Sequence, residues 1–203
     1  MGLNSKLQQY VQGLDLSSVQ DERKELLEQL AKLLVERKEL DAFLFVCTHN
    51  SRRSQLTQAW FALFAHAYGF DSLGVHSAGT EATAFYPSAI EALQHAGADV
   101  EFNSNEKNPK VAISFSEEVP PLISFSKTLD HSSIPKKNIV AILTCGHADE
   151  NCPMVRGAEA RISLNYIDPK WSDFTQDEQE AYRSCSQLIA TEIKFIFDSI
   201  TKS

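Results

Sequence analysis

The sequence is poor in cysteine and in positive charge, and it has no long apolar run. Four cysteines in 203 residues are too few for a disulfide scaffold, so in a reducing compartment we expect them to pack or to do chemistry. The net charge of −8 argues against nucleic-acid binding, which usually needs a basic face. No stretch approaches the ~20 apolar residues that span a bilayer, and the amino terminus has no signal-peptide pattern. The composition therefore predicts a cytoplasmic protein that binds neither nucleic acid nor membrane.

The chain does contain enough apolar residues for a core. A hydrophobic content of 43% over 203 residues suits one domain with an appendage. The appendage is predicted over residues 1–40, where Ser17 and Gln20 form a capping signal for an amphipathic helix that runs to Leu40. Its leucine stripe is expected to cover either the body or a partner subunit, so a homodimer through this helix is one expectation.

Residues 41–203 are predicted to form the main α/β domain, because strand and helix patterns alternate along them. The region between residues 100 and 135 is the hardest to interpret. The alternation indicates a doubly wound, flavodoxin-like parallel sheet of four strands with helices on both faces and ligands at the carboxyl ends of the strands. We expect strands at 42–46, 74–77, 111–115, 138–144 and 160–166, and helices at 55–68, 87–96, 120–129 and 175–200.

The most informative segment is the loop that follows the first predicted strand. The strand ends in Cys47, and after five further residues Arg53 and Ser54 open a helix. Such a loop turns main-chain N–H groups inward, and the helix adds the positive end of its dipole. The resulting pocket favours a tetrahedral oxyanion and stabilises the thiolate of Cys47, while Arg53 can present its planar fork to two anion oxygens.

The other residues of this loop suit the same chemistry. Asn50 tolerates left-handed backbone, and Ser54 can donate its hydroxyl to the thiolate. The pattern alone also allows an inert buried Cys47 beside a solvated helix start; the strand before it and the helix after it favour the nucleophile. The predicted oxyanion-binding residues are Thr48, His49, Asn50, Ser51, Arg52 and Ser54.

A second candidate segment carries Cys145 and Cys152 after another predicted core strand. If the segment is helical, their α-carbons lie about 10 Å apart, beyond the ~4.4 to 6.8 Å of a disulfide. Pairing would then require unwinding, which Gly146 and Pro153 would ease. A zinc site from Cys145, His147 and Cys152 lacks a fourth ligand nearby, and two packed, unreactive cysteines are the remaining alternative.

Asp168 is the third candidate, and it precedes Pro169 just past the last predicted strand. A carboxyl group at this end of the sheet can overhang the Cys47 pocket and protonate a departing oxygen as a general acid. Because Asp-Pro pairs are also common in turns, this feature does not decide the question by itself.

In this order along the chain, the features resemble low-molecular-weight protein tyrosine phosphatases and their relatives, the thioredoxin-coupled arsenate reductases. The resemblance covers roughly residues 42–200. The loop and Asp168-Pro169 are shared by both branches. The segment from Cys145 to Cys152, which is followed by Pro153 and Met154, resembles the reductases specifically. The matching features are the loop 47–55, the Ser77-Ala78-Gly79 turn, the cysteine pair and the Asp-Pro pair.

The resemblance implies a catalytic role for each candidate. Cys47 would attack the anion, Arg53 would hold its oxygens, and Asp168 would protonate the leaving group. In a reductase, Cys145 would then attack Cys47, and Cys152 would attack Cys145, which carries the disulfide outward to thioredoxin. The predicted function is therefore reduction of arsenate to arsenite, and neither a cofactor nor a resident metal is expected.

Two other functions stay open at this point. One is a tyrosine phosphatase acting on a phosphate monoester, with Trp171 or Tyr86 as the aromatic wall beside the substrate ring. The other is a noncatalytic redox or metal sensor that uses Cys145, His147 and Cys152 as a switch.

Three residues differ from the pattern of the family. His49 stands where the family usually has glycine, and Arg52 where it often has a second cysteine. Histidine adopts left-handed backbone only moderately well, so we expect a somewhat different loop shape, with added positive charge from Arg52. Gln58 stands where reductases often have a glutamate, which weakens the case for a bound potassium ion.

Overall fold

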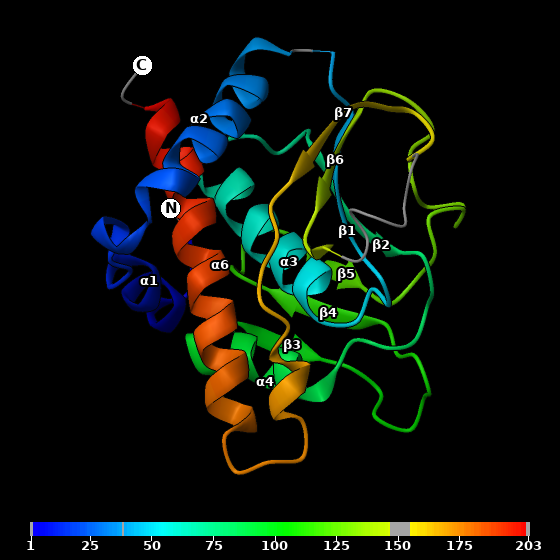
Figure 1. Ribbon diagram of the computed structural model, residues 1–203. Coiled ribbons are helices and arrows are strands. Elements are labelled where there is room, and N and C mark those ends of the chain that lie inside the picture. The colour runs from blue at the N-terminus through cyan, green and yellow to red at the C-terminus, as the bar shows by residue number, and fades with distance from the viewer. Residues whose placement is uncertain (1, 38, 147–154, 202–203) are drawn as a thin grey trace.

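The computed structural model describes residues 2–37, 39–146 and 155–201 (Figure 1). Its centre is a four-stranded sheet in the order β2-β1-β6-β7, and every strand pairing in it is parallel. This arrangement confirms the predicted doubly wound parallel sheet. The strands are β1 (Ala42–Cys47), β2 (Gly74–Gly79), β6 (Ile139–Leu143) and β7 (Ala158–Ser163).

The central strands are apolar along their whole length because the sheet has a core on each face. All residues of β1 and β6 are buried. Alternate residues point to opposite faces, so Phe43 and Phe45 enter the larger core, whereas Leu44 and Val46 enter a smaller one. The larger core lies between the sheet and the helices α3 (Arg53–Ala67), α4 (Pro87–Ala96) and α6 (Glu178–Ile200).

The amino-terminal extension packs against the same core. It comprises α1 (Ser5–Gln12), the 3-10 turn η1 (Leu16–Ser18) and α2 (Asp21–Glu36), and α2 lies beside α6 (Figure 1). Leu27, Leu30 and Leu34 of α2 are buried in the larger core, which confirms that the leucine stripe covers the body. The homodimer and the division at residue 40 stay predictions.

The start of the predicted amino-terminal helix was wrong. The Asp15 carboxylate accepts hydrogen bonds from the amide and hydroxyl of Ser17 (2.9 and 2.6 Å), so the Ser17 hydroxyl is used within η1. The helix α2 begins instead at Asp21, after Gln20 as its N-cap. None of the helices that the structure describes is both long and apolar enough to cross a membrane.

The helix predicted at 120–129 was also wrong. A second, antiparallel sheet stands there, made of β3 (Asp99–Glu101), β4 (Val111–Ser114) and β5 (Leu122–Ser124). In β5 the exposed Ile123 is followed by the buried Ser124, the period-two alternation of a strand. Ser124 donates hydrogen bonds to side chains of α3, so tertiary contacts override the local pattern.

Candidate active site

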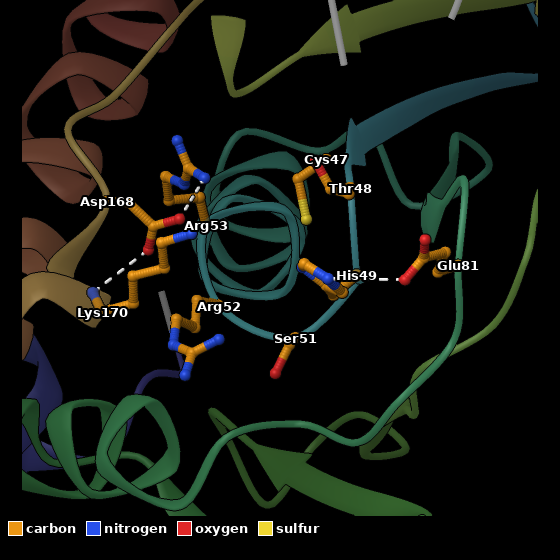
Figure 2. A pocket seen from close by; sticks show the side chains of 9 residues that line it. All are labelled: Cys47, Thr48, His49, Ser51, Arg52, Arg53, Glu81, Asp168 and Lys170. Carbon is orange, nitrogen blue, oxygen red and sulfur yellow. Dashed lines mark hydrogen bonds and ion pairs between the residues drawn. The ribbon is translucent and has the colours of Figure 1, made fainter. Parts of the chain in front are cut away.

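A cavity of about 330 Å³ lies at the carboxyl end of β1 (Figure 2). Cys47, Arg53 and Asp168 face the same cavity, although the last two are 115 residues apart in the chain. The structure therefore brings together the predicted nucleophile, guanidinium and carboxyl group. The lining residues are Cys47, Thr48, His49, Ser51, Arg52, Arg53, Glu81, Asp168 and Lys170.

Hydrogen bonds from outside hold the anion loop, which we define as residues 47–54. The carbonyl groups of residues 48–51 each accept a hydrogen bond from a surrounding segment. Within the described parts of the chain, no group accepts a hydrogen bond from the amides of residues 49–52. These donors and the start of α3 make the loop a site for an anion. The pairs are Glu81 N to Thr48 O (2.8 Å), Ser126 Oγ to His49 O (2.9 Å), Gln55 Nε2 to Asn50 O (3.0 Å) and Tyr86 N to Ser51 O (2.9 Å).

A chain of hydrogen bonds aims the Ser54 hydroxyl at the nucleophile. The amide of Lys127 can only donate, so it fixes Asn50 Oδ1 as the acceptor at 2.9 Å. Asn50 Nδ2 therefore faces the other way and donates to Ser54 Oγ at 2.9 Å. The hydroxyl hydrogen of Ser54 stays available for Cys47 Sγ, which lies 3.0 Å from Ser54 Oγ. Asn50 has the left-handed backbone expected for it, with φ 46°.

Gly79 at the end of β2 lets the anion loop approach the sheet closely. A Cβ atom there would lie 2.5 Å from Thr48 O and 2.7 Å from Asn50 N, both main-chain atoms. Ser77-Ala78-Gly79, expected as a turn, is instead the last part of β2 and lies directly against the loop, and only glycine fits at its last position.

Arg53 joins the anion loop to the segment that carries Asp168. Its Nη1 donates to Tyr166 O at 2.9 Å, and its Nη2 forms an ion pair with Asp168. The Arg53 Nε atom is buried and has no hydrogen-bond partner among the described residues, so one donor of this guanidinium is unsatisfied. The two side chains are 12% and 15% exposed, so this pair is only weakly screened by water.

Cys145 lies beside the anion loop. It follows β6, whose Leu143 is paired with Val46 next to Cys47, and Thr48 Oγ1 is 3.7 Å from Cys145 Sγ. Both Cys145 and Cys47 are buried. The other members of this proposed relay and of the zinc alternative, Cys152 and His147, lie outside the described residues.

Cys185 differs from these cysteines. It is half-buried on α6, and burial raises the pKa of its thiol to about 12. A thiol with that pKa is protonated near neutral pH, so Cys185 is a packing residue.

All three residues that differ from the family pattern contact other side chains, and the contacts of Arg52 are described below. His49 Nε2 lies 3.4 Å from a Glu81 carboxylate oxygen on the cavity rim. The Gln58 amide donates to Val75 O at 2.9 Å and accepts from the hydroxyls of Ser77 and Ser124 at 2.6 and 2.9 Å. Gln58 is thus part of a network of neutral side chains, and it does not supply the negative charge that a glutamate would have at this position.

Sequence reasoning missed several supporting residues. Lys127 and Ser126 hold the anion loop, and Ser124 binds side chains of α3, all from a segment that was predicted to be a helix. Glu81 and Lys170 face the cavity without any local pattern that marks them. No sequence signal could have found Lys127, Ser124 and Ser126, because their partners lie 66 to 77 residues away in the chain.

Lys127 should make stability depend on pH. Burial lowers the pKa of Lys127 to about 8, although its amino group donates to Phe125 O (3.1 Å) and lies over the Phe125 ring. The nearby His76 also has a lowered pKa, through burial and then through the Lys127 charge. Between pH 8 and the ordinary lysine value, the unfolded chain binds more protons than the folded chain, so the free energy of unfolding should rise with pH.

Lys127→Met should therefore stabilise the protein at pH 7 by about 1 to 3 kcal/mol, and by little near pH 10. Urea unfolding of both proteins at the two pH values measures the difference. An equal stabilisation at pH 7 and pH 10 would contradict the idea that the buried Lys127 amine destabilises the fold only in its charged form.

The comparisons with known proteins agree with this geometry. Residues 42–116 match the model of the low molecular weight phosphotyrosine protein phosphatase family. The arsenate reductase of Halalkalibacterium halodurans is 30% identical over 151 residues, which are 74% of this chain and 90% of that protein.

The chain belongs to the arsenate reductase branch of the low-molecular-weight phosphotyrosine phosphatase superfamily. Solved structures share its fold at low identity. An arsenate reductase in the oxidised state has a TM-score of 0.52 at 17% identity, with 79% of this chain and 99% of that chain covered. A phosphotyrosine phosphatase from Vibrio cholerae has a TM-score of 0.53 at 15% identity, with 79% and 97% covered. With its relatives named arsenate reductase, the chain is an enzyme of the arsenate reductase or phosphotyrosine phosphatase type.

Proposed function

We propose that this enzyme reduces arsenate to arsenite, with Cys47 as nucleophile and with Cys145 and Cys152 as a relay that thioredoxin regenerates. The oxyanion is held by the main-chain donors of the anion loop and by Arg53. Asp168, on the other side of the cavity, supplies the proton for the leaving group. Its cytoplasmic location follows from the relay, which needs a reducing compartment.

The steps balance in atoms and electrons. The Cys47 thiolate attacks arsenic, and Asp168 protonates the hydroxyl group, which leaves as water. The Cys145 thiolate then attacks the Cys47 sulfur, and the electron pair of the sulfur–arsenic bond stays with arsenic, which leaves as arsenite. Arsenic gains two electrons as the two sulfurs form a disulfide. Cys152 attacks the Cys145 sulfur and frees Cys47, and the dithiol of thioredoxin reduces the Cys145–Cys152 disulfide.

The observation that carries this proposal is the position of Cys145. Its sulfur lies 3.7 Å from the hydroxyl of Thr48, the residue after the nucleophile, at the end of the neighbouring strand. A phosphatase has no use for a second cysteine there, because water hydrolyses its cysteinyl phosphate. The relatives named arsenate reductase support the same choice.

Serine replacement of the relay cysteines separates the steps. Cys152→Ser should abolish multiple turnover with arsenate and thioredoxin, yet still release about one arsenite per enzyme, because the first two steps use only Cys47 and Cys145. Cys145→Ser should release none. Both variants should keep whatever aryl phosphatase activity the native enzyme has.

Cys185→Ser is the matched control, and it should retain multiple turnover. If Cys152→Ser lost reduction and phosphatase activity to the same degree, or if it kept multiple turnover, the relay would be refuted.

A phosphotyrosine phosphatase is the second candidate, favoured by Trp171. Its side chain is 78% exposed on the turn that follows Asp168, where a substrate ring can stack on it. Tyr86 does not suit this role, because its ring is covered by Arg52 at 4.0 Å and stacked on Tyr182 at 5.2 Å. Trp171→Ala would weaken phosphotyrosine cleavage in such an enzyme and spare arsenate reduction in the reductase.

A further inference from the structure

Two adjacent arginines hold the two ends of one short turn. Asp168 is the N-cap of the 3-10 turn η2 (Pro169–Ser172), and Asp173 is its C-cap. Arg53 pairs with Asp168, and Arg52 pairs with Asp173 through Nη2 at 2.5 Å. The turn that carries the proposed general acid is therefore fastened twice to the start of α3.

The guanidinium of Arg52 interacts with side chains of the protein itself. Its Nε donates to the Tyr182 hydroxyl, and its carbon lies 4.0 Å from the centroid of the Tyr86 ring. Tyr182 in turn donates to Asp173 Oδ1 at 2.7 Å. Burial raises the pKa of Tyr182, so this hydroxyl keeps its proton for that bond. We call Arg52, Asp173 and Tyr182 the Arg52 clamp.

The second fastening matters once an anion binds. A tetrahedral dianion at the anion loop competes with Asp168 for Arg53, because both are negative ligands of one guanidinium. The dianion also repels the Asp168 carboxylate across the small cavity. Both effects push the 168–173 turn away at the moment when its acid is needed.

The backbone next to the clamp is in a costly conformation. Phe174 has φ 64°, which is unusual for a bulky residue and persists only where its surroundings enforce it. The neighbouring Asp173 side chain is held by the clamp, and the amide of Phe174 donates to Glu178 Oε2 at 2.7 Å. Without the clamp, we expect this segment to relax away from the cavity.

We propose that Arg52 is a positioning residue: through Asp173 and Tyr182 it keeps Asp168 over the cavity after the oxyanion has taken Arg53. This inference rests on the proposed oxyanion transfer at Cys47, and it assigns to Arg52 a role other than binding the anion. The Arg52 clamp thus keeps the 168–173 turn in place even when substrate binding weakens the ion pair between Arg53 and Asp168.

The leaving group of an aryl phosphate tests this role. Phenolate is a poor leaving group and needs a proton from Asp168, whereas 4-nitrophenolate leaves readily without one. Asp173→Asn, which lies outside the cavity lining, should slow release of phenol from phenyl phosphate about 10-fold and of 4-nitrophenol less than about 3-fold. Asp168→Asn, which has no general acid, gives the two release rates expected when the acid contributes nothing.

The matched control is Asp177→Asn, the same change four residues later on an exposed side chain that makes no capping bond. It should leave the ratio of the two rates at the native value. Inorganic phosphate, measured by its protection of Cys47 against iodoacetamide, should bind native and Asp173→Asn proteins equally. A native rate ratio in Asp173→Asn, or an equal loss with both esters, would overturn the proposal.

Hydrogen exchange tests the clamp without any turnover. The amide of Asp173 donates to Lys170 O within the turn, and the amide of Thr175, just after the turn, donates to Ser172 O. With saturating phosphate, Asp173→Asn should exchange both amides faster than the native protein does, and unchanged exchange would overturn the inference. If the native protein acts on neither arsenate nor aryl phosphates, the proposed function fails, and the exchange result still decides the clamp.

Discussion

Replacement of Cys47 with serine should abolish arsenate reduction and lower any aryl phosphate cleavage by at least about 10⁴-fold, the scale seen when a nucleophile is removed. A serine hydroxyl is not ionised near neutral pH, and its oxygen cannot form a disulfide with Cys145. Arsenite release and phenol release, each measured under single turnover, check the two losses.

The same variant should still bind the anion. The loop donors and Arg53 do not depend on the sulfur, and a serine at this position can keep a hydrogen bond to Ser54 Oγ, which lies 3.0 Å from the cysteine sulfur. Phosphate affinity by calorimetry should therefore stay within a few-fold of the native value. Retained turnover in Cys47→Ser would show that the Cys47 sulfur is not the nucleophile. That result would favour the alternative in which the cysteines serve a noncatalytic sensor.

Replacement of Gly79 with alanine should disrupt the anion loop itself. The new Cβ would meet main-chain atoms of Thr48, Asn50 and Glu81 at 2.5 to 2.7 Å, and main-chain atoms cannot rotate aside as side chains do. Overpacking of this kind should lower the free energy of unfolding by about 3 kcal/mol, and phosphate binding should be lost because the loop must move.

Urea unfolding and phosphate protection of Cys47 check both effects. The control is Gly13→Ala at the end of α1, where φ is −79° and the nearest atom to a new Cβ lies 3.4 Å away. That change should alter stability by less than about 1 kcal/mol. Normal phosphate binding in Gly79→Ala would show that the loop does not rely on this close approach.

The sequence alone predicted the parts of the site that are local. Cys47, Arg53 and Ser54 lie within eight residues, between a strand that is apolar throughout and an apolar helix, so their geometry follows from the strand–loop–helix order. The left-handed Asn50 follows from the tight turn of that loop. Asp168 was found because the carboxyl ends of parallel strands meet at one edge of the sheet.

Prediction failed where distant contacts outweigh local preference. The segment 120–129 was expected to be a helix, but β5 pairs with β4, and the Ser124 hydroxyl donates toward the side-chain amide oxygens of Gln55 and Gln58. The contacts of Ser124 with Gln55 and Gln58 span more than sixty residues, and no window of sequence contains both sides.

The residue types around Cys47 determined an electropositive loop with a sulfur nucleophile, because main-chain donors, a helix start and a guanidinium act over a few ångströms within one segment. Only the tertiary structure decided what surrounds that loop. Arg52 looks like a second anion ligand in the sequence, yet folding brings Tyr182 and Asp173, 130 and 121 residues away, to its guanidinium. A charged side chain binds the partners that packing places within reach, and packing is a property of the whole chain.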